Sequence, residues 1–150
     1  MADETELEVF RQFTSHQEKF DYFLMSVAAA AIGFAIHRTT GMAMERLMLL
    51  LGVAVTLWAI SFFAGCRRRQ YVGSTMFANF ELLRVQKGEN PEIGMHPQKI
   101  QAASEGILRA AAYNSKRASF WATIQLYTLF IGAIVFIVWH VLEMSKICSK

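Results

Sequence analysis

The chain has 150 residues, of which 54% are hydrophobic and 18% are charged, and its formal net charge is +3. This length suits one domain rather than two, and a mean hydropathy of +0.29 is high for a water-soluble globule of this size. Two cysteines are too few for a disulfide framework, and the modest glycine and proline content excludes fibrous and disordered classes. The composition therefore indicates a membrane protein.

Three stretches of the chain contain no Asp, Glu, Lys or Arg, at residues 22–36, 47–66 and 118–142. A helix needs about 20 residues to cross the roughly 30 Å hydrocarbon core of a bilayer. The second and third stretches meet this length, and the first is expected to recruit its flanks to span residues 20–37, a buried or re-entrant helix being the alternative there. We therefore predict an all-α integral membrane protein with three transmembrane helices.

The N-terminal segment is acidic. Residues 1–21 hold six carboxylates and two cations, a net charge of −4. A cleaved signal peptide begins with a short basic region, so we expect the first transmembrane helix to be retained. Within residues 1–20, Leu7, Phe10 and Phe13 recur on one helical face, which predicts an amphipathic N-terminal helix.

Basic residues are concentrated between the second and third apolar stretches. Residues 67–117 hold nine Lys and Arg, whereas residues 38–46 and 143–150 hold two each. Because basic loops stay on the cytoplasmic side, we predict that residues 67–117 and the N-terminus are cytoplasmic, and that the 38–46 loop and the 143–150 tail are external. The expected location is a plasma or bacterial inner membrane. Three consecutive arginines follow the second stretch directly and are expected to set topology and attract anionic lipid rather than nucleic acid. They are Arg67, Arg68 and Arg69.

The cytoplasmic connection has the pattern of a helical hairpin. Gly and Pro cluster at residues 88–97, and Pro97 suits the first position of a helix. The two arms, about 20 residues each, carry apolar residues at helical spacing. These residues are Val72, Met76, Phe80 and Leu83 in the first arm and Ile100, Ala103 and Ile107 in the second. The connection has a net charge of +5, from nine cations and four carboxylates, so we expect the acidic N-terminal helix to pack on it as a three-helix cytoplasmic bundle.

Small and polar residues inside the spans are the candidates for helix contact or for a pathway. Ala29 and Gly33 form a small-xxx-small pair in the first span, a spacing that lets helices approach closely, within the chain or between copies. Thr123, Gln125 and Thr128 form a polar patch in the third span. Polar groups in lipid need partners, so these three residues are expected either to line a pathway or to hold helices together.

Two titratable residues lie near the outer end of the third span. His140 and Glu143 are three positions apart and share a helical face. A histidine beside a carboxylate can gate proton or ion movement, and the alternative is a pair of ordinary interfacial groups exposed to water. Trp121 and Trp139, 18 residues apart, are expected near the two membrane interfaces.

Enzyme and metal motifs are not found. The sequence contains no phosphate-binding loop, no dinucleotide-binding glycine pattern, no HExxH, no CxxC and no GxSxG, so we expect no catalytic, cofactor-binding or metal-binding residues. Two functions remain: a homo-oligomer that forms or gates a pore or perturbs the membrane, and a membrane-anchored adaptor that binds a protein partner through its cytoplasmic hairpin. The polar patch in the third span favours the first function, and the plain, unbranched hairpin favours the second. Three helices alone are too few to enclose a pathway, so the first function requires several copies.

Overall fold

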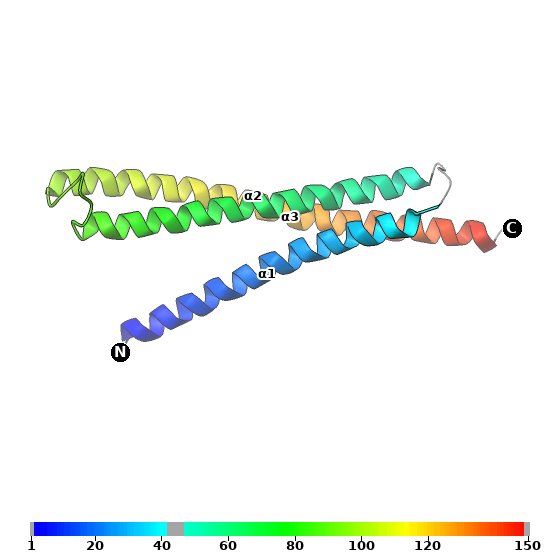
Figure 1. The fold of residues 1–150 in the computed structure, drawn as a ribbon, viewed down its shortest axis with the longest axis horizontal. Helices are drawn as coiled ribbons and strands as arrows, with labels where there is room; N and C mark the ends of the chain where they lie inside the picture. Colours follow the sequence, from blue (N-terminus) through cyan, green and yellow to red (C-terminus); the bar gives the residue numbers. More distant parts are fainter. Residues whose placement is uncertain (1, 42–46, 149–150) are drawn as a thin grey trace. The chain divides into compact units, whose positions relative to one another are not determined.

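The structure is a computed structural model of the chain and contains three long helices (Figure 1). It describes residues 2–41 and 47–148, and for residues 2–7, 9–11, 13, 14, 147 and 148 the backbone alone. The helices are α1 (Ala2–Thr39), α2 (Met48–Gln86) and α3 (Pro97–Cys148), and the described ranges contain no strand. All three helices are long and apolar enough to cross a membrane. The prediction of an all-α chain with three such helices is confirmed.

Each helix is longer than a bilayer requires. The helices contain 38, 39 and 52 residues, which is roughly 57, 58 and 78 Å at 1.5 Å per residue, against a hydrocarbon core of about 30 Å. In α2 and α3, one unbroken helix carries both an apolar stretch and an arm of the charged connection.

Local sequence explains where the helices meet the turn. Gly88 has a φ of +72°, a left-handed value that suits glycine. Its N–H donates to the Val85 carbonyl (3.1 Å), and the Glu89 N–H donates to the Arg84 carbonyl (3.0 Å). These two bonds form the Schellman motif that ends α2. The next helix begins at Pro97, where no backbone N–H is needed.

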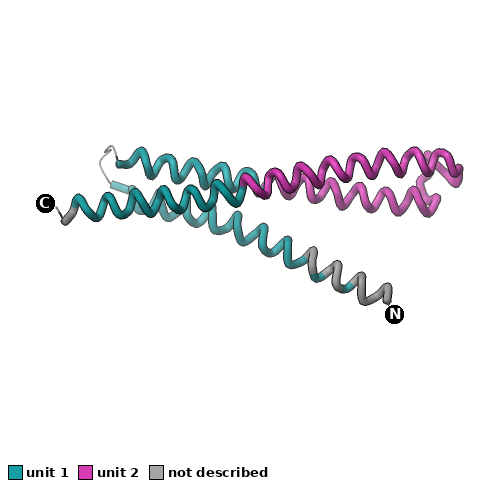
Figure 2. The backbone as a smooth tube through the Cα atoms, turned by 180° about the vertical axis from the view of Figure 1, so that it is seen from behind, with its two compact units in different colours: residues 1–65, 125–150 teal, residues 66–124 magenta. Residues whose placement is uncertain are grey.

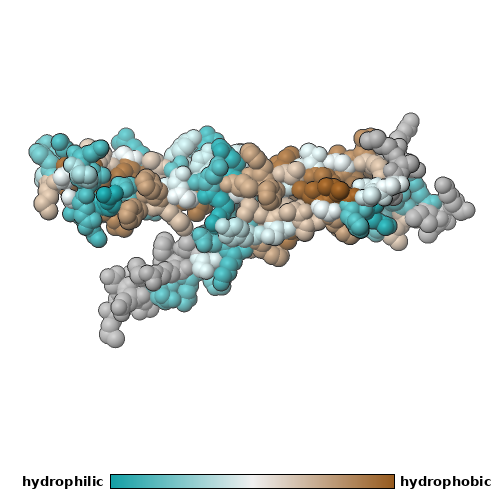
Figure 3. Space-filling model, viewed as in Figure 1, coloured by the Kyte–Doolittle hydropathy of each residue, from teal (hydrophilic) through white to brown (hydrophobic). Residues whose placement is uncertain are grey.

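The chain divides into two compact units, shown in different colours in Figure 2. Unit 1 contains residues 1–65 and 125–150, and unit 2 contains residues 66–124. Unit 1 packs α1 with the first part of α2 and the last part of α3, and Figure 3 shows apolar side chains gathered over it. Its core contains Leu24, Ala28, Ala35, Leu51, Ala54, Trp58, Leu129 and Trp139.

Small residues let the helices of unit 1 come close. Ala28 and Ala54 are completely buried. A Cβ added at Gly132 would lie 2.8 Å from the indole Nε1 of Trp58 and 3.3 Å from the backbone oxygen of Ala54. Only glycine leaves room there for the Trp58 ring, which packs on Phe136 with 5.5 Å between ring centroids. The indole therefore occupies space that a larger residue on α3 would need.

Unit 2 is a helical hairpin formed by the last part of α2, the turn at residues 87–96 and the first part of α3. Val85 and Ala111 are buried in it. In contrast, Met76, Phe80 and Leu83 of the predicted apolar stripe are exposed. The two arms of the hairpin therefore do not cover this stripe.

Candidate functional site

Gln125 is the most unusual polar residue of unit 1. Its side chain is fully buried, and neither Oε1 nor Nε2 has a hydrogen-bond partner among the described residues. It lies in α3, one turn before the core residue Leu129. A buried polar group without a partner costs about 1–3 kcal/mol of stability. The unpaired amide is therefore expected to destabilise the apolar core of unit 1.

Two hydroxyl groups converge on the backbone of the same residue. The Ser61 hydroxyl, itself fully buried, donates to the Gln125 carbonyl oxygen over 2.8 Å and so joins α2 to α3. The Thr128 hydroxyl donates to the same carbonyl over 3.3 Å. Gln125 therefore has a satisfied backbone oxygen and an unsatisfied side chain. Ser61 was not singled out from the sequence, where a lone serine in an apolar stretch carries no signal.

The Gln125 amide is tightly packed against neighbouring helices. A Cβ at Gly65 would lie 2.8 Å from the Gln125 Nε2 and 2.7 Å from Cγ of Met25. Thus α1, α2 and α3 all meet at this point, through Met25, Gly65 and Gln125. Asp21, one turn before Met25, is only 4% exposed, so unit 1 buries a carboxyl group as well as the amide. Neither Gly65 nor Asp21 was predicted from the sequence.

The other predicted pathway and contact residues do not share this environment. Thr123 is exposed, and its hydroxyl donates to the Ser119 carbonyl of the same helix over 3.1 Å. Ala29 and Gly33 are both exposed, and no atom lies within 4 Å of a Cβ added at Gly33. The small residues of α1 that belong to the core or pack against it are Ala28, Ala31 and Ala35. Of the candidates within the spans, Gln125 and Thr128 face inward and the others face outward.

The two titratable residues His140 and Glu143 lie near the C-terminal end of α3. His140 is exposed and stacks on Phe136 with 6.4 Å between centroids and 3° between ring planes. Glu143 is half-buried, and no hydrogen bond or ion pair joins it to His140 in the described structure. Trp139, expected at a membrane interface, is 2% exposed and packs on Phe136 inside unit 1.

The three arginines begin the part of α2 that belongs to unit 2. Arg67 donates to Gln70 Oε1 over 2.9 Å, and its guanidinium lies 5.6 Å from the centroid of the Tyr71 ring. Arg68 and Arg69 are half-exposed. At this distance the guanidinium is attracted to the face of the tyrosine ring.

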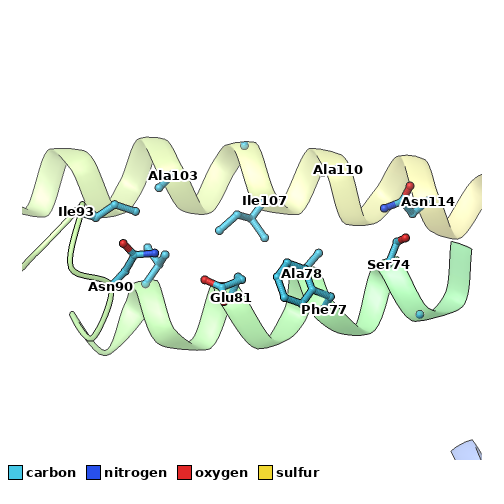
Figure 4. A pocket seen from close by; sticks show the side chains of 13 residues that line it. Ser74, Phe77, Ala78, Glu81, Asn90, Ile93, Ala103, Ile107, Ala110 and Asn114 are labelled. Carbon is cyan, nitrogen blue, oxygen red and sulfur yellow. The ribbon is translucent and has the colours of Figure 1, made fainter. Parts of the chain in front are cut away.

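A second candidate site is a groove of about 830 Å³ between the arms of the hairpin. Figure 4 shows side chains from both arms and from the turn lining it, among them Ala78 of α2, Ile93 of the turn and Ile107 of α3. Small residues on both helices, such as Gly73 and Gly106, keep the groove open. Its shape and its mainly apolar lining are suited to a side chain or helix of a partner.

Metal ligands do not come together in the part of the chain that the structure describes. No group of three or more His, Cys, Asp or Glu side chains lies close enough to hold an ion there. Cys66 is a free thiol, half-exposed beside the arginines. Comparisons with protein-family models, with curated proteins and with solved structures found no match.

Proposed function

We propose that the chain is the subunit of a homo-oligomeric membrane protein that forms or gates a pathway for ions or small polar solutes, or perturbs the membrane. The supporting observation is the Gln125 side chain, fully buried with both amide atoms unpaired. In lipid such a group must find a partner. Water that enters along the pathway would supply it, without a fixed partner inside the protein.

The proposed arrangement follows from helix length and charge. The N-terminus and residues 67–117 lie in the cytoplasm, because that segment holds nine of the chain's 15 Lys and Arg. The apolar stretches of α1, α2 and α3 cross the membrane, and copies associate through faces such as that of Ala29 and Gly33, which point away from the core. Three helices per copy are too few to enclose a pathway, so several copies are required.

Flux through liposomes tests this proposal. Protein purified in detergent should run as a discrete multimer and should conduct ions after reconstitution. Gln125→Leu should lower the flux about tenfold or more if removal of the amide costs the permeating species roughly 1.4 kcal/mol. The matched control is Tyr127→Leu, on an exposed position two residues further along α3, which should leave the flux unchanged. Wild-type protein that conducts nothing would eliminate the pathway.

The second candidate function is a membrane-anchored adaptor. It is favoured by the hairpin, which combines an open apolar groove with exposed Met76, Phe80 and Leu83. Large exposed apolar patches mark interaction sites, so a protein partner would cover this one. A monodisperse monomer without flux would favour the adaptor over the oligomeric pathway.

A further inference from the structure

The hairpin carries more exposed apolar surface than a water-facing segment normally does. Phe77 lines the groove and is 66% exposed, and Phe80 and Leu83 are 57% and 56% exposed. Figure 3 shows apolar patches alternating with hydrophilic ones on the molecule's surface. Residues 67–117 also hold thirteen charged side chains, too many for the bilayer interior. We therefore expect a protein, rather than lipid, to cover the exposed apolar side chains of the hairpin.

We propose that the hairpin groove binds the acidic amphipathic helix of residues 2–20 from a second copy of the chain. The inference rests on the homo-oligomer of the proposed function and names the contact that joins its copies. The binding mode is a helix laid in a groove, with apolar side chains at helical spacing as anchors. Leu7, Phe10 and Phe13 supply that spacing.

Charge selects this occupant. Residues 1–21 have a net charge of −4 and the hairpin has a net charge of +5. Lys87, Lys99 and Lys116 are exposed and pair with no carboxylate in the described ranges. An acidic helix would place carboxylates near them, whereas a second hairpin docking in the same groove would bring like charges together. Complementary charge of this kind fixes the partner and the register of a contact.

Length and topology agree with the charge argument. The segment of residues 2–20 rises roughly 28 Å and each hairpin arm about 30 Å, at 1.5 Å per residue. Because two crossings, those of α1 and α2, separate the N-terminal segment from the hairpin, both lie on the same side of the membrane in either orientation. The acidic helix of one copy and the groove of its neighbour therefore share one aqueous layer.

The acidic segment is the first part of α1, one unbroken helix over residues 2–39. All the residues that line the groove belong to residues 73–114. In the homo-oligomer of the proposed function a neighbouring copy supplies the acidic helix, and cross-linking between copies distinguishes it from the helix of the same chain.

Cross-linking between two tagged copies tests the proposal in full-length protein in membranes. Cys66 and Cys148 are first replaced by serine in both copies. One copy then carries Phe13→Cys and the other carries Ala110→Cys, an exposed position lining the groove. A short bismaleimide should give a product that bears both tags. A single chain carrying both cysteines should not be linked internally.

Filling the groove supplies a variant that preserves the fold. Gly106 lines the groove, and no atom lies within 4 Å of a Cβ placed there. Gly106→Leu therefore adds a side chain to empty space and improves helix propensity. It should lower the doubly tagged product about tenfold, as expected when a docking contact is lost. The matched control is Ala102→Leu, at an exposed position outside the groove, which should leave the yield unchanged.

The outcomes separate this inference from the proposed function. A doubly tagged product that Gly106→Leu abolishes and Ala102→Leu preserves would support it. A link confined to single chains, or no link at all, would overturn it. If the protein still ran as a discrete multimer and conducted ions, the proposed function would stand without this contact; a monomer without flux would remove both.

Discussion

Replacing Gln125 by leucine should stabilise the protein, although polar-to-apolar changes of buried groups often do the opposite. Both amide atoms of Gln125 are buried and unpaired, so the substitution removes an unsatisfied group without breaking a bond. The hydrogen bond from Ser61 is retained, because it ends on the backbone oxygen of residue 125. Leucine and glutamine have similar helix propensities.

The expected size follows from these contacts. Each unsatisfied atom costs about 1–3 kcal/mol in a protein interior, but polar contacts in membranes average only about 0.6 kcal/mol because the unfolded helices also find partners. Removing the two unpaired atoms should therefore raise the free energy of unfolding by roughly 1–3 kcal/mol. The different shape of leucine beside Gly65 and Met25 should offset up to about 1.5 kcal/mol of this gain. The net expectation is a gain of about 1 kcal/mol.

Reversible unfolding in mixed detergent micelles measures this difference, with Tyr127→Leu on the exposed face as the control for added hydrophobicity. Gln125→Leu should gain stability while it loses flux, the trade-off expected when a destabilising group serves function. A loss of more than about 1 kcal/mol would refute the reasoning, because it would show that the amide has a fixed partner inside the protein.

Two further predictions concern packing and topology. Gly132→Ala should lower the free energy of unfolding by about 1–2 kcal/mol in the same assay, because overpacking against Trp58 exceeds the gain in helix propensity. Gly52→Ala, whose Cβ meets no atom within 4 Å, should instead raise it by up to about 1 kcal/mol. Equal effects at the two glycines would contradict the described packing. Neutralising Arg67, Arg68 and Arg69 together should produce mixed topology in reporter fusions, and an unchanged topology would show that other residues determine orientation.

The pattern of residues along the chain predicts the helices and the turn that joins α2 to α3. Charge-free stretches of sufficient length specify apolar helices, because a buried backbone in lipid must satisfy its own hydrogen bonds. The turn between α2 and α3 is also specified by its own residues. Gly88 takes the left-handed conformation that ends α2, and Pro97 begins α3. These features depend on neighbouring residues only, and so they can be predicted without knowing what packs against what.

Which side of each helix faces inward depends on how the helices pack against one another. Thr123 and Gln125 are two residues apart, yet the first is exposed and the second is fully buried. Likewise Ala28 lies in the core while Ala29 is exposed. Lipid is as apolar as a protein core, so a spanning helix carries no hydrophobic stripe that marks its inner face. The inner face emerges only when close approaches, such as that of Gly132 to Trp58, bring the helices together.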